Sequence, residues 1–96
     1  MQPRHGGRAL LQLRESTADS VSYAVTVWEP QQQWTGSAEV TIATGEVTLS
    51  ALEAAPEWLR DLLRTTLRGA WRNSAAEGWP RRLARWRPKP ADQVQT

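Results

Sequence analysis

Cysteine is absent from this chain of 96 residues. Its absence excludes disulfides, thiolate catalysis and cysteine-ligated metal sites, and fits a reducing compartment. Histidine occurs once, as His5 near the N-terminus, so no catalytic pair of a nucleophile and a histidine base is expected. The acidic residues lack the spacing of metal ligands, and the glycines fit no phosphate-binding loop. We therefore expect no enzyme, no metal site, no cofactor and no small-molecule substrate.

Long apolar runs are also missing. No run approaches the roughly 20 residues that a membrane-spanning helix needs. Residues 1–7 lack the apolar stretch of a signal peptide. We therefore expect a cytoplasmic chain without a membrane partner.

The length and composition fit one folded domain. The chain is too short for two domains, and 40% hydrophobic with 23% charged residues is typical of globular proteins. Residues 1–8 show no apolar periodicity, and we expect them to form a flexible N-terminus. Residues 89–96 are expected to form a flexible C-terminal tail, which leaves a single domain at residues 9–88.

Alternation of apolar and polar residues predicts strands in the first half. In residues 20–28 every second side chain, from Val21 to Val27, is apolar, as in a strand with one buried face. Residues 34–43 alternate in the same way, and shorter segments at residues 9–15 and 46–50 complete four expected strands.

The turns between these segments set the expected pairing. A two-residue turn at residues 44–45 pairs Ile42 with Val47, and the polar loop after the second strand places Glu29 opposite Trp34. Both registers put the apolar side chains on one face. The strands are therefore expected to form an antiparallel meander.

Helical periodicity dominates the second half. Residues 59–71 place apolar side chains at the i, i+3, i+4, i+7 spacing of one helical face. The helix is expected to begin either at a capping box of Ser50 and Glu53 or at Pro56, and to end at Gly78.

Arginines recur on the other side of this helix, and a second short helix is expected after it. The ridge away from the leucines consists of Arg60, Arg64, Arg68 and Arg72. Pro80 is suited to open a short basic helix that Pro88 stops. The expected fold class is α+β, with a meander of three to four strands packed on one long amphipathic helix, followed by this short basic C-terminal helix.

Arginine and tryptophan are concentrated in residues 71–89 of a chain that has six tryptophans and no phenylalanine. Arginine neutralises phosphates and tryptophan stacks on unpaired bases, so this tract suits single-stranded nucleic acid. Packing on the domain is the alternative that we favour. In that reading the arginines are solvated and the buried stripe consists of Trp71, Trp79, Leu83 and Trp86.

Two further features bear on partners. Trp28 points away from the long helix, so it is either an exposed anchor for a partner or is covered by Trp79 or Trp86 of a C-terminal helix that folds back. The short fourth strand leaves a sheet edge at which a second copy would pair to give a symmetric dimer.

Charge asymmetry and the absence of catalytic groups favour a binding role. Residues 1–50 hold three basic and five acidic residues, whereas residues 51–96 hold nine basic and five acidic ones. We expect a non-enzymatic interaction module that binds a protein partner or itself. The alternative is nucleic-acid binding through the C-terminal tract. The candidate contact residues are Trp28, Arg81, Arg82, Arg85, Trp86 and Arg87.

Overall fold

The computed structural model describes residues 6–88. The ends that were expected to be flexible, residues 1–5 and 89–96, lie outside the described residues, whereas residues 6–8 belong to the first strand. The elements are β1 (Gly6–Ser16), β2 (Ser20–Glu29), β3 (Gln32–Thr41), β4 (Val47–Ser50), α1 (Glu57–Glu77) and β5 (Arg82–Pro88).

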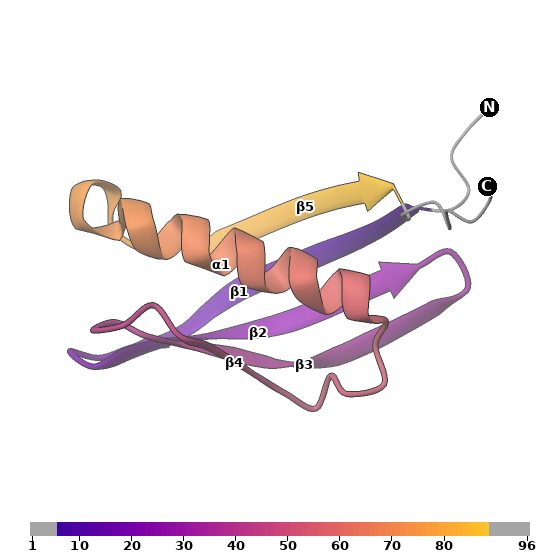
Figure 1. Ribbon diagram of the computed structural model, residues 1–96, viewed down its shortest axis with the longest axis horizontal. Helices are drawn as coiled ribbons and strands as arrows, with labels where there is room; N and C mark the ends of the chain where they lie inside the picture. The colour runs from indigo at the N-terminus through magenta and orange to yellow at the C-terminus, as the bar shows by residue number, and fades with distance from the viewer. Residues whose placement is uncertain (1–5, 89–96) are drawn as a thin grey trace.

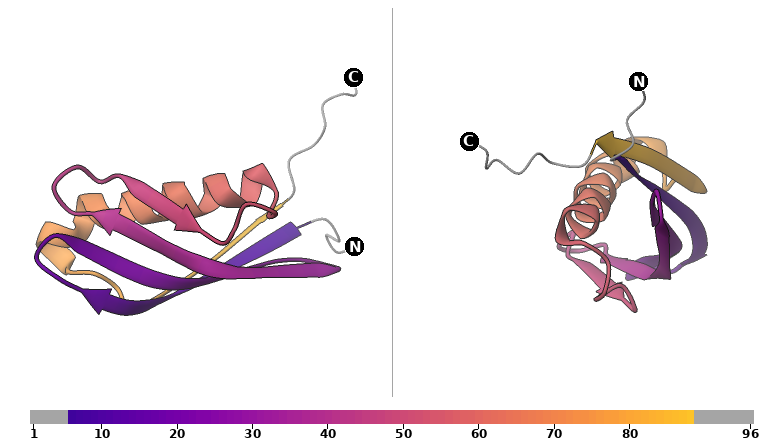
Figure 2. Two further views of the ribbon diagram at one scale, coloured as in Figure 1. Left: turned by 90° about the horizontal axis from the view of Figure 1, so that it is seen from below. Right: turned by 90° about the vertical axis from the view of Figure 1, so that its right-hand side faces the viewer.

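The strands form one antiparallel sheet in the order β4-β3-β2-β1-β5. Helix α1 lies along one face of the sheet and carries the chain from edge strand β4 to edge strand β5 (Figure 1). We call the face toward α1 the inner face and the opposite one the outer face. Within residues 6–88 no helix or strand covers the outer face (Figure 2). The α+β class and the long helix on an antiparallel sheet are confirmed.

The expected short basic C-terminal helix is wrong, because the chain after Pro80 forms strand β5. In a helix Leu83 and Trp86 would share one side, but in the strand Leu83 lies on the inner face and Trp86 on the outer. Arginine, leucine and alanine favour a helix locally. Pairing with β1 satisfies a backbone edge that would otherwise be open, and Leu83 packs opposite Leu11, so tertiary contacts override that preference.

The core lies between the inner face and α1. Its buried sheet residues are Ala9, Leu11, Val21, Tyr23, Val25, Val27, Ala38, Val40 and Leu83. Its buried helix residues are Leu59, Leu62, Leu63, Thr66 and Leu67. Both periodicities are therefore confirmed: every second residue of β2 and the leucine stripe of α1 are buried against each other.

Both expected registers were wrong by two residues. Val47 pairs with Val40 rather than Ile42, and Trp34 pairs with Val27 rather than Glu29. A shift of two residues keeps every side chain on its face, since side chains alternate with period 2. The assignment of faces therefore survives the error in register.

A longer connection between β3 and β4 explains the first shift. The indole Nε1 of Trp71 donates a hydrogen bond to the Ile42 carbonyl oxygen at 2.8 Å. Its ring also lies against Gly45, where an added Cβ would be 2.7 Å from Trp71 Cδ2 and where φ is 76°. The loop is thus held against the helix by Trp71, a contact that the sequence pattern of a hairpin turn does not include.

The helix ends were partly predicted. Pro56 precedes α1, and its carbonyl oxygen accepts hydrogen bonds from Leu59 and Arg60. The alternative capping box is wrong, because Ser50 is the last residue of β4. Gly78 ends the helix as expected, with φ of 76° and its N–H bonded to the Ser74 carbonyl oxygen.

Replacing Leu63 by alanine is expected to lower the free energy of unfolding by roughly 2–5 kcal/mol, because its fully buried side chain would leave a cavity. Chemical denaturation measures this change. The control is Thr65→Ala on the exposed side of the same helix, which should stay within about 0.5 kcal/mol of the original. Equal effects of the two substitutions would contradict the assigned helix face.

The second prediction concerns alkaline pH and Tyr23, the only tyrosine of the chain. Its hydroxyl donates a hydrogen bond to the Pro80 carbonyl oxygen at 2.6 Å, and burial raises its pKa from 10.0 to about 12. The phenol therefore ionises more easily in the unfolded chain. The free energy of unfolding should therefore be highest below pH 10 and should fall by on the order of 2–3 kcal/mol as the pH rises to about 12.

Denaturation at a series of alkaline pH values, followed with tyrosinate absorbance, measures this loss. Tyr23→Phe is the control, since it lacks the ionising group and should lose less stability over the same range. A tyrosinate signal that appears at the ordinary pKa while the protein is still folded would contradict the buried environment of Tyr23.

Candidate binding surfaces on the two sides of strand β5

Strand β5 divides the arginine- and tryptophan-rich tract between two surfaces. Arg82 and Trp86 lie on the outer face, in register with Gln12 and Arg8 of β1. Arg85 and Arg87 pair with Ala9 and Gly7, so they lie on the inner side next to α1. The predicted residues are thus divided between the two sides of β5.

Arg81 lies just before this strand. Its carbonyl oxygen accepts a hydrogen bond from the Leu13 N–H at 2.8 Å, and the residue is exposed. The main chain of Arg81 therefore helps to join β5 to β1, and its side chain is available at the edge of the sheet.

On the outer face, one row of side chains crosses four strands. Arg8 of β1 pairs with Trp28 on one side and with Trp86 on the other, while Gln33 of β3 pairs with Trp28. Neighbouring strands lie about 4.8 Å apart, so the backbones that carry the two tryptophans are separated by roughly 10 Å. Arg8 therefore occupies the position between the two tryptophans in this row.

Trp28 and Trp86 line one open groove of about 270 Å³, which we call the tryptophan groove. Its other residues come from β1 and β5: Arg8, Ala9, Leu10, Arg82, Ala84 and Arg85. No carboxylate is among them, and Leu10 and Ala84 pair at its centre. The groove therefore combines aromatic rings, a small apolar floor and positive charge, which suits a flat and negatively charged ligand.

The two indoles are held differently. Trp28 is half-buried, and its Nε1 donates a hydrogen bond to Gln33 Oε1 at 3.0 Å, which fixes the orientation of the ring. Trp86 lies over Gly6, where an added Cβ would be 2.6 Å from Trp86 Cζ2, and 51% of its surface is exposed. Trp86 is the only large hydrophobic residue within residues 6–88 that is this exposed.

Most of the side chains that were expected to form a buried stripe do pack on the domain. Leu83 is buried, and Trp71 and Trp79 are half-buried against the core, so three members of the expected stripe pack on the domain. Trp86 does not, and that part of the expectation is wrong. Trp28 shares a groove with Trp86, but through strand pairing rather than a helix that folds back.

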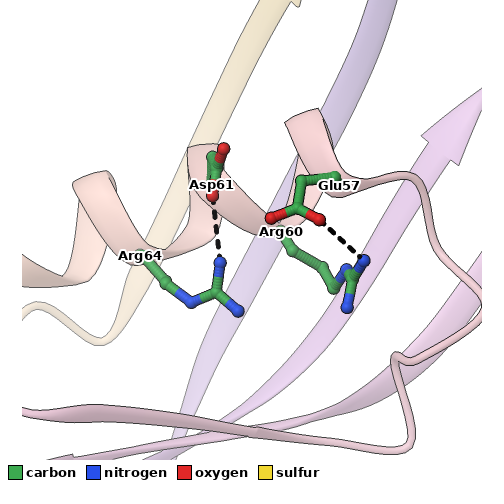
Figure 3. A network of polar contacts seen from close by, with 4 residues as sticks. All are labelled: Glu57, Arg60, Asp61 and Arg64. Atoms are coloured by element: carbon green, nitrogen blue, oxygen red, sulfur yellow. Dashed lines mark hydrogen bonds and ion pairs between the residues drawn. The ribbon is translucent and has the colours of Figure 1, made fainter.

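Part of the arginine ridge of α1 lies near the inner side of β5. Arg60 is paired with Glu57 at 3.3 Å and Arg64 with Asp61 at 3.0 Å (Figure 3). Arg68 lies further along the same ridge and lines an open hollow together with Arg87 of β5. Positive charge is therefore present on both sides of the edge strand.

Sequence reasoning missed Arg8 and Leu10. Arg8 was assigned to the flexible N-terminus, and Leu10 belonged to the expected strand at residues 9–15 but was not chosen as a contact residue, whereas both lie in β1 on the outer face. The alternation of Ala9 and Leu11 toward the core was the available signal, because it places Arg8 and Leu10 on the opposite face.

Within residues 6–88 no group of three or more potential metal-ligating side chains gathers. In the same part of the chain, no helix combines the length and apolar character needed to cross a membrane.

Trp86 is expected to dominate quenching of the tryptophan fluorescence by acrylamide. Replacing it by phenylalanine should remove the most accessible component, because this indole has the largest contact with water. The control is Trp71→Phe, which removes a half-buried, hydrogen-bonded indole and should leave that component in place. An accessible component that persists in Trp86→Phe would contradict the position of this side chain.

No protein-family model matches the chain, and comparison with curated proteins and with solved structures gave no match.

Proposed function

We propose that the chain is a non-enzymatic binding module and that the tryptophan groove binds single-stranded nucleic acid. The observation that carries the proposal is the row in which Arg8 lies between Trp28 and Trp86 on an uncovered sheet face. Indoles stack on bases of any sequence, and a guanidinium group pairs with phosphate. The three side chains thus supply the two contacts that a single strand needs.

The two tryptophans favour a single strand over a duplex. Stacking requires bases whose faces are accessible, and the faces of bases in a duplex are already stacked on their neighbours. Trp28 is anchored by its hydrogen bond to Gln33, so little ordering of this ring is needed when a base stacks on it. Arg82 lies on the same face, one row beyond Ala84, and extends the positive charge along β5.

A protein partner, which the sequence analysis favoured over nucleic acid, is the second candidate here. Tryptophan and arginine are the residues that most often dominate protein interfaces. Edge strand β5 has seven residues, and its free side is open to the addition of a strand from a partner. The same arginines favour a partner segment that carries acidic residues.

A second copy fits the tryptophan groove less well. Two-fold contact through this groove would place Arg8 and Arg82 of both copies together without any carboxylate among the lining residues. Strand β4 is the opposite edge of the sheet, as expected for the fourth strand, and offers four residues for pairing of two copies. Sedimentation over a range of protein concentrations tests that contact directly.

The proposed function is tested by fluorescence anisotropy with labelled single-stranded oligonucleotides at low salt. Replacing Trp86 by leucine should weaken binding roughly 5- to 150-fold, which corresponds to loss of one stacked base. Trp86→Phe is the matched control, because it retains an aromatic ring and should retain most of the affinity. Trp28→Leu should likewise weaken binding, and Trp28→Phe should likewise retain most of the affinity.

Three results would contradict the proposal. The first is a lack of oligonucleotide binding at low salt. The second is binding that Trp86→Leu and Trp28→Leu leave unchanged. The third is equal affinity for single strands and duplexes, which would indicate contact with phosphates alone.

A further inference from the structure

The arginine ridge of α1 is only partly neutralised. Arg60 and Arg64 each have an acidic partner one turn earlier in the helix, Glu57 and Asp61 (Figure 3). Further along the ridge, Arg68 and Arg72 are exposed and have no ion pair within residues 6–88. The ridge therefore changes from paired to unpaired charges toward the C-terminal half of the helix.

Strand β5 adds a further arginine to the unpaired part. Arg87 lies on the inner side of β5, where its register partner is Gly7, and lines an open hollow of about 490 Å³ with side chains of α1. We call the four arginines of this hollow the arginine cluster: Arg64, Arg68, Arg72 and Arg87. Asp61 is the only acidic residue that lines it, so the net charge of the hollow is +3.

Such an arrangement suits a ligand with several negative charges. Like charges that are gathered around one hollow repel each other, and a bound anion would relieve that repulsion. Guanidinium groups match phosphate oxygens with two parallel hydrogen bonds. From residue 61 to residue 72 the helix rises by roughly 16 Å, so an elongated polyanion fits the hollow better than a single small ion.

The arginine cluster is continuous with the tryptophan groove. Trp86 and Arg87 are neighbours in the chain and lie on opposite sides of β5. Strand β5 is the edge of the sheet, so nothing within residues 6–88 separates the two surfaces at that edge. A flexible strand that leaves the groove beside Trp86 therefore meets the cluster after passing around a single β-strand.

We propose that the arginine cluster binds the phosphates of the same single strand whose bases occupy the tryptophan groove. The inference rests on the proposed function and extends it to a second surface. Short oligonucleotides occupy the groove alone. Longer ones pass around β5 and gain the phosphate contacts of Arg68, Arg72 and Arg87.

The experiment measures affinity and its salt dependence for oligothymidylates of about 3 to about 12 nucleotides, since small folds that bind single strands cover roughly 4–16 nucleotides. The unmodified chain should bind the longest oligonucleotide more tightly and with a steeper salt dependence. The double variant Arg68→Gln with Arg72→Gln should lose that gain. The slope of log K against log salt should fall by about 0.7 for each phosphate contact that is lost.

A matched double variant removes the same charge elsewhere. Arg14 is exposed near the opposite end of β1, and Arg60 belongs to the paired part of the ridge. Arg14→Gln with Arg60→Gln should therefore leave the length-dependent gain in place. Both arginine double variants should bind the shortest oligonucleotide as the unmodified chain does, because they leave the tryptophan groove intact.

The possible failures are distinguishable. If Trp86→Leu weakens binding but Arg68→Gln with Arg72→Gln leaves the length dependence and the salt slope unchanged, the cluster is not part of the path and only the further inference is overturned. An equal loss in both arginine double variants also overturns it, because net charge then explains the effect. If no oligonucleotide binds, or binding ignores both tryptophans, the proposed function and the inference are overturned together.

Discussion

Burial of the inner face of the sheet beneath the leucine stripe of α1 is the contact on which the rest of the structure depends. Val21, Val25 and Val27 would be exposed to water without the helix, and Leu59 and Leu63 would be exposed without the sheet. The burial leaves the outer face uncovered, and it turns the arginine ridge of α1 outward. Both surfaces that we propose for binding therefore follow from a single hydrophobic contact.

The sequence was sufficient to assign the faces of the central elements. Alternation of apolar residues in β2 and β3, and the 3.6-residue period of α1, each report which side chains avoid water. The register of strand pairing was harder to predict from the sequence, because a register shifted by two residues satisfies the same alternation of apolar and polar residues. The contact between Trp71 and Gly45 that lengthens the β3–β4 connection joins residues distant in the chain, and no local signal contains it.

The site was predicted only in part, and the reason is β5. Of the residues chosen from composition, Trp28, Arg82, Arg85 and Trp86 line one groove, whereas Arg87 lines the hollow on the other side of β5. Local propensity favours a helix in that segment. Pairing with the open edge of β1 makes the segment a strand instead. The side of β5 on which each side chain of the tract lies follows from that change.

The pairing of β1 with β5 also has a consequence for the order of folding. The two strands are at opposite ends of the described chain, and Gly6 pairs with Pro88. During synthesis, the backbone N–H and C=O groups on one side of β1 therefore lack their strand partner until β5 has been made. Contacts of such wide sequence separation form slowly, since closure of a long loop must come first. The groove that contains Trp28 and Trp86 is thus complete only once β5 has joined the sheet.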